Sequence, residues 1–116
     1  MTTSLTIPGI RDAVAAVLPE TQRFLCELIR FPSLPGKELE AMDYVAKRMA
    51  EVSDVERIPL SNSLREDEDY ADPVPGIEYD GRFNVRAVRK GAGGGRSLLF
   101  NTHLDVVQAS QGQERP

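Results

Sequence analysis

The sequence has few of the residues that form disulfides or bind metals in small secreted proteins. It contains one cysteine, one histidine and no tryptophan among 116 residues. The single cysteine, Cys26, excludes an internal disulfide and fits a reducing compartment. The net charge of −4 provides no excess of basic side chains, which nucleic-acid binders concentrate on one surface. The composition therefore predicts a cytoplasmic protein that does not bind nucleic acid.

Long apolar runs are also missing. The first nine residues, MTTSLTIPG, lack the basic start of a signal peptide. The longest early apolar run, residues 13–18, is too short to cross a membrane. At 12.8 kDa the chain has the size of one small domain, and we expect no membrane partner.

Apolar residues at helical spacing predict two helical regions. A first helix is expected over residues 9–18, and the apolar stripe continues after Pro19 through residues 24–29. Pro19 either kinks one helix or separates two. An amphipathic helix is expected over residues 37–52, after the break FPSLPG.

Three strands are predicted after the helices. They cover about residues 55–60, 82–87 and 96–107, and the last is apolar enough to be buried on both faces. The Asp80-Gly81 turn is expected to join residues 77–79 to the second strand as a hairpin. Residues 61–75 are polar, acidic and aperiodic, which indicates a solvated loop. This order of elements predicts an α/β fold with helices packed on a mixed, partly parallel sheet.

The last predicted strand carries polar side chains on one face. In an extended chain alternate residues point the same way, so Asn101, His103 and Asp105 share a face. Such a face is expected where the end of a strand opens into a ligand-binding crevice. His103 is then a candidate zinc ligand, and Asp105 would orient it or ligate directly. An ordinary hydrogen-bonded pair remains the alternative, because a catalytic zinc site generally needs three protein ligands.

The arrangement of segments resembles a known family. Residues 98–107, LLFNTHLDVV, resemble the first metal-ligand motif of the zinc-dependent metallopeptidase family of aminoacylase, acetylornithine deacetylase and succinyl-diaminopimelate desuccinylase. Two segments upstream resemble the family in the same order. They are LCELIRFPSLPGKELEAMDYVAKRM, residues 25–49, and RFNVRAV, residues 82–88, with its asparagine Asn84. Two positions depart from the family motif: Thr102 stands where glycine is usual and Gln108 where proline is common.

The resemblance implies a function and a site. His103 would bind one of two divalent cations, zinc or cobalt, and Asp105 would orient that histidine and assist catalysis. The reaction implied is hydrolysis of an amide bond in N-acyl amino acids or small peptides. Water activated by the cations would attack the carbonyl while a glutamate moves the proton.

The other parts of the family's site follow this motif. They are a bridging aspartate, the glutamate, the remaining ligands and a smaller lid domain, and none is recognisable in this chain. We therefore expect residues 1–116 to be the N-terminal part of a zinc-exopeptidase-like catalytic domain, inactive without the remainder of the same enzyme. Its apolar last strand should then expose a hydrophobic surface.

Two other interpretations follow from the residues alone. One is a non-catalytic α/β interaction module with an incomplete or decayed metal site. The other takes GAGGG, residues 91–95, as a phosphate-binding loop, which is disfavoured because such loops follow a strand and open a helix.

Overall fold

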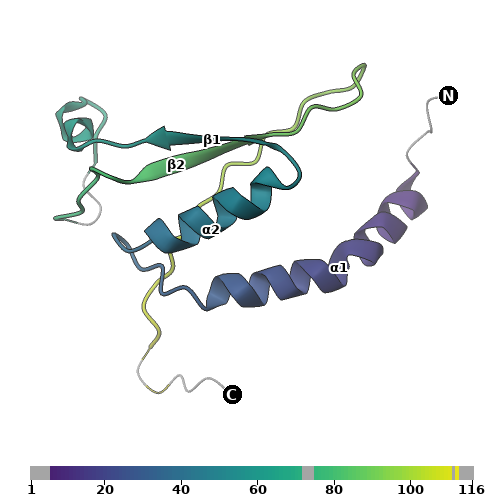
Figure 1. Cartoon of the computed structure of the whole chain (residues 1–116), viewed down its shortest axis with the longest axis horizontal. Helices are drawn as coiled ribbons and strands as arrows, with labels where there is room; N and C mark the ends of the chain where they lie inside the picture. The colour runs from purple at the N-terminus through teal and green to yellow at the C-terminus, as the bar shows by residue number, and fades with distance from the viewer. Residues whose placement is uncertain (1–5, 72–74, 111, 113–116) are drawn as a thin grey trace. The chain divides into compact units, whose positions relative to one another are not determined.

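The computed structural model describes residues 6–71, 75–110 and 112. Its elements are helix α1 (Ile7–Ile29), helix α2 (Leu39–Ala50), strand β1 (Asp54–Pro59), 3-10 helix η1 (Asn62–Glu66) and strand β2 (Phe83–Val88) (Figure 1). The chain is a small α/β protein, as the sequence predicts. It divides into two units, residues 1–31 and 32–116. Within the described residues no helix has both the length and the apolar character of a membrane span.

The first unit is the helix α1. Thr6 caps its N-terminus, where the Thr6 hydroxyl accepts a hydrogen bond from the Gly9 N–H at 3.3 Å. Pro19 lies inside this helix, so the two helical stretches expected on either side of it are one element. The proline ring removes one backbone donor, and the hydrogen bonds of the flanking turns still hold the helix together.

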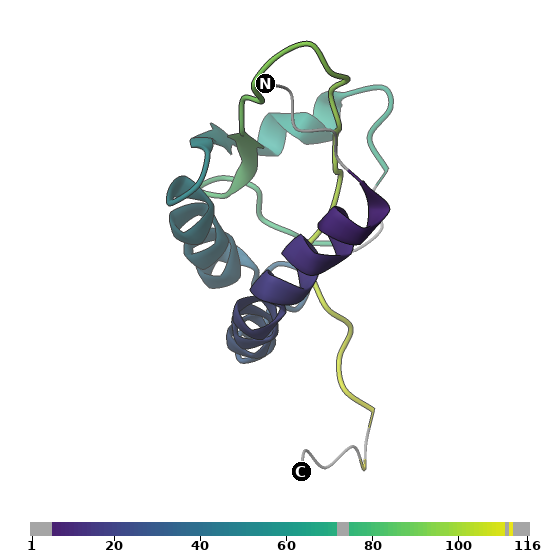
Figure 2. The same ribbon diagram turned by 90° about the vertical axis from the view of Figure 1, so that its right-hand side faces the viewer.

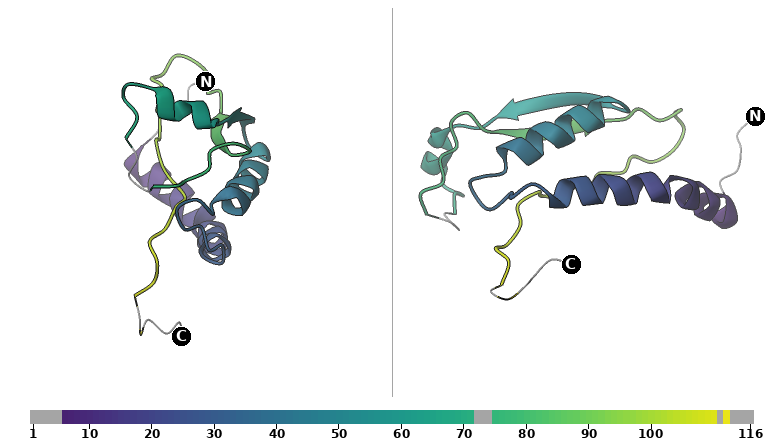
Figure 3. Two further views of the ribbon diagram at one scale, coloured as in Figure 1. Left: turned by 90° about the vertical axis from the view of Figure 1, so that its left-hand side faces the viewer. Right: turned by 60° about the horizontal axis from the view of Figure 1, so that its bottom comes forward.

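The second unit is built on α2, which covers one face of a two-stranded sheet (Figure 3). The predicted amphipathic helix is confirmed, with ends two residues inside the expected bounds. Its buried side chains are Ala41, Val45 and Ala46, and their small size lets the helix approach the strands closely. An ion pair between Asp43 of α2 and Arg57 of β1 adds a polar link between the two elements.

The sheet is one antiparallel pair, with Asp54 opposite Val88 and Pro59 opposite Phe83. The predicted hairpin between residues 77–79 and β2 is wrong, because β2 pairs with β1. Asp80-Gly81 does form a turn, in which the Arg82 N–H donates to the Tyr79 carbonyl at 3.1 Å. The solvated loop predicted over residues 61–75 contains η1, and its residues 72–74 lie outside the described residues.

The predicted strand over residues 96–107 is the main correction. After β2 the chain reverses at Gly93 and Gly94, whose positive φ angles favour glycine, and runs back without a strand ladder (Figures 1 and 2). Leu98, Leu99 and Phe100 are 78%, 89% and 81% exposed. A strand buried on both faces needs neighbouring strands and two covering layers, and the described residues provide neither here. The parallel part of the expected sheet stays a prediction.

Candidate functional site

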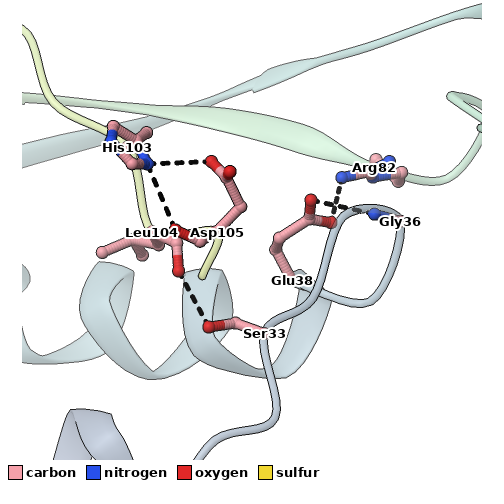
Figure 4. A network of polar contacts seen from close by, with 7 residues as sticks. All are labelled: Ser33, Gly36, Glu38, Arg82, His103, Leu104 and Asp105. Atoms are coloured by element: carbon pink, nitrogen blue, oxygen red, sulfur yellow. Dashed lines mark hydrogen bonds and ion pairs between the residues drawn. The ribbon is translucent and has the colours of Figure 1, made fainter. Parts of the chain in front are cut away.

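His103 and Asp105 lie together on the segment that follows the glycine turn. The His103 Nδ1 is 2.9 Å from the Asp105 Oδ1 and 3.2 Å from the Asp105 backbone oxygen (Figure 4). The extended backbone gives these alternate residues a common side, which is the part of the strand prediction that survives. The side chains are 78% and 46% exposed, so water and ligands can reach the imidazole.

The pair lines a cleft of about 560 Å³ within the second unit. One wall is residues 98–105, and the others come from α2 and β2. Both asparagines that the sequence singled out, Asn84 and Asn101, lie on this lining. The cleft thus brings together candidate residues from two segments of the chain. Of the four side chains, those of His103 and Asp105 form a hydrogen bond with each other, and Asn84 and Asn101 do not join it.

Ser33 connects the break FPSLPG to the segment that carries the pair. Its hydroxyl donates to the Leu104 carbonyl at 2.8 Å, and its own carbonyl accepts from the Val106 N–H at 2.9 Å. Ser33 is the one polar residue among the buried side chains of the described chain, with 4% exposure. These two bonds hold the backbone on both sides of Asp105, and Figure 4 draws the one to Leu104.

A second polar contact lies on the cleft beside the pair. Glu38, the residue before α2, forms an ion pair with Arg82, the residue before β2 (Figure 4). Glu38 also accepts from the Gly36 N–H at 2.9 Å, and Gly36 has a φ of +87°. The Arg82 Nη1 is buried and has no hydrogen-bond partner among the described residues. The contact therefore fixes the start of α2 against the start of β2.

The fit of this site to a metal ion is partial. The Asp105 contact involves the Nδ1 of His103 and leaves its Nε2 as a possible ligand. Across residues 6–71, 75–110 and 112, however, no three His, Cys, Asp or Glu side chains come close enough to hold a metal. The pair can thus supply one imidazole ligand with a carboxylate behind it, and further ligands must come from elsewhere.

A scan against protein-family models finds no match, and a search of the solved structures finds none. The family resemblance and the roles of His103 and Asp105 therefore stay predictions from the sequence.

Three residues of this region were not predicted as site residues: Ser33, Glu38 and Arg82. All three lie in the segments that resemble the family, Ser33 and Glu38 in residues 25–49 and Arg82 at the start of residues 82–88, but the resemblance assigned them no role. Their contacts join residues 71 and 44 positions apart, and no single-sequence pattern reveals such pairing.

Proposed function

We propose that this chain supplies His103 and Asp105 to the active site of a metal-dependent amidohydrolase or exopeptidase. Its substrates would be N-acyl amino acids or small peptides, and its cations zinc or cobalt. The observation that carries the proposal is the 2.9 Å contact between the His103 Nδ1 and the Asp105 carboxylate on the lining of the cleft. Histidine ligands of metals commonly have such a carboxylate on the second ring nitrogen.

Each residue has a definite task in this proposal. Asp105 accepts a hydrogen bond from the Nδ1–H of His103, which fixes the tautomer and turns the Nε2 lone pair outward. A bound cation would polarise the amide carbonyl and lower the pKa of water. His103 holds the cation, and a carboxylate from outside the described residues must move the proton.

The exposed apolar segment supports the same proposal. Leu98, Leu99 and Phe100 precede His103 and form an uncharged run of the kind found inside parallel sheets. We propose that further strands of the catalytic domain pair with this run and complete the mixed, partly parallel sheet. In that arrangement His103 and Asp105 lie at the carboxyl end of a central strand, where α/β sheets bind ligands.

The experiment is a metal and activity assay of the natural gene product, compared with its His103→Ala and Asp105→Asn variants. We expect bound zinc or cobalt, hydrolysis of N-acetyl amino acids, and loss of both with His103→Ala. Asp105→Asn should lower metal affinity by about 10–100-fold. Asp69→Asn, in the exposed acidic run, is the matched control and should change neither. Unchanged metal content and unchanged activity in His103→Ala would contradict the proposal.

A non-catalytic interaction module is the second candidate, and one observation favours it. The same exposed run, Leu98 to Phe100, would serve as a contact surface for another protein. In that case Leu99→Ser abolishes complex formation while His103→Ala leaves it intact. The enzyme proposal expects His103→Ala to abolish hydrolysis instead.

A further inference from the structure

We infer that Ser33 is a positioning residue for the His103–Asp105 pair. The inference rests on the proposed function, because it assigns Ser33 the task of keeping that pair ready to bind a cation. No contact of Ser33 reaches either side chain directly. It acts through the backbone between and beside them.

The geometry of the two bonds carries the inference. The Ser33 hydroxyl holds the carbonyl of Leu104, and the Ser33 carbonyl holds the N–H of Val106. Leu104 separates His103 from Asp105, and Val106 follows Asp105. The backbone is therefore fixed on both sides of Asp105, and the carboxylate projects on the same side as the imidazole (Figure 4).

The surroundings show why a fixed backbone matters at this place. Residues 98–107 have no strand ladder among the described residues, so ordinary sheet hydrogen bonds do not set their conformation. An extended backbone puts alternate side chains on one face, which favours the i, i+2 contact between His103 and Asp105. Ser33 supplies two hydrogen bonds that favour that conformation, one from its side chain and one from its backbone.

The direction of the Ser33 hydroxyl rules out a nucleophilic role in this arrangement. A serine activated by a His–Asp pair donates its hydrogen bond to the imidazole. Here the hydroxyl donates to a backbone carbonyl, and the residue is 4% exposed. Ser33 is thus buried and its hydroxyl is hydrogen-bonded to the backbone. This arrangement suits a role in positioning residues 103–106, and not attack on a substrate.

The lone histidine makes a direct test possible. In uniformly ¹⁵N-labelled chain, long-range ¹H–¹⁵N spectra report the tautomer of His103 without overlap from other histidines. At alkaline pH, where an ordinary imidazole is neutral, we expect the Nδ1–H tautomer that the Asp105 contact requires. Ser33→Ala keeps the backbone bond and loses the hydroxyl, so the ring should shift toward the Nε2–H tautomer that the side chain of free histidine favours.

A matched control separates this effect from a general loss of stability. Ser53→Ala also removes one hydroxyl that donates to a backbone carbonyl, that of Met49 at 2.6 Å, and should leave the His103 tautomer unchanged. An unchanged tautomer in Ser33→Ala, with native signals from α2, β1 and β2, overturns the inference. Should Ser33→Ala fail to fold, hydrogen exchange in the unaltered chain decides. We expect the Val106 N–H to exchange more slowly than that of Val107, and equal rates overturn the inference.

Zinc titration of the same samples separates this inference from the proposed function. If both hold, Zn²⁺ perturbs the His103 ring, and Ser33→Ala needs about tenfold more of it, the lower end of the effect of groups that orient a ligand. If Zn²⁺ leaves His103 unchanged while Ser33→Ala still shifts the tautomer, the proposed function fails and the orienting role of Ser33 stands. If Zn²⁺ binds both forms equally, the positioning role is wrong.

Discussion

The Glu38–Arg82 ion pair should have a larger coupling energy than the exposed ion pairs of the second unit. The side chains are 12% and 20% exposed, and breaking a buried pair typically costs 3–5 kcal/mol. Partial exposure lowers that cost, and for two residues in direct contact we expect a coupling energy of about 2 kcal/mol from a double-mutant cycle. Glu38→Gln should cost more than Arg82→Met, because it leaves the whole guanidinium buried, including the Nη1 that already lacks a partner.

The matched control is a second Arg–Glu pair in the same unit. Arg86 and Glu56 lie opposite each other across the sheet and are 64% and 54% exposed. Exposed pairs contribute about 0.2–1 kcal/mol, so its coupling energy should stay below about 1 kcal/mol. The assay is a double-mutant cycle on each pair by urea unfolding followed by circular dichroism, with sulfate added to keep the folded state populated. Equal couplings in the two cycles would refute the assignment of the first pair as a buried link.

Three further perturbations test other parts of the fold. Gly36→Ala should destabilise the second unit by about 1–2 kcal/mol in urea unfolding, because Gly36 has a positive φ that alanine adopts at a cost. Gly91 lies outside the positive-φ region, so Gly91→Ala should not have this effect. The ion pairs with Lys47 and then with Arg57 hold the pKa of Asp43 below its ordinary value of 3.8. The stabilisation from Asp43 is therefore complete above that value and is lost as the pH falls through the lowered pKa. Asp43→Asn should make the free energy of unfolding fall less steeply below pH 3.8. An unchanged pH profile would contradict the ion pairs. Leu99→Ser should reduce the fluorescence of a bound hydrophobic dye more than Val52→Ser, because Leu99 belongs to a contiguous apolar run and Val52 does not. Equal reductions would count against an apolar patch at residues 98–100.

The elements that the sequence predicted well are those that depend on local periodicity. The apolar spacing of α2 and the alternation in β2 are set by residues a few positions apart, so their bounds were correct within about two residues. Pro19 was ambiguous, because a helix can either end at a proline or continue past it, and the sequence does not show which.

The last segment was predicted less well for a physical reason. Its apolar run indicates a strand that would be buried between adjacent strands of a sheet. The periodicity of the sequence does not show whether those adjacent strands are present. The alternation still placed His103 and Asp105 on one side, because that needs only an extended backbone. The contact with Ser33, 71 residues away, depends on tertiary structure and has no signature in one sequence.

The measurement that tests the role of His103 most directly is a Zn²⁺ titration of uniformly ¹⁵N-labelled chain. We expect the Nε2 of His103 to shift with added Zn²⁺ while Nδ1 stays protonated and bonded to Asp105, and Asp105→Asn to weaken the response. A His103 ring that remains unchanged while Zn²⁺ perturbs the acidic run at residues 66–69 would contradict it.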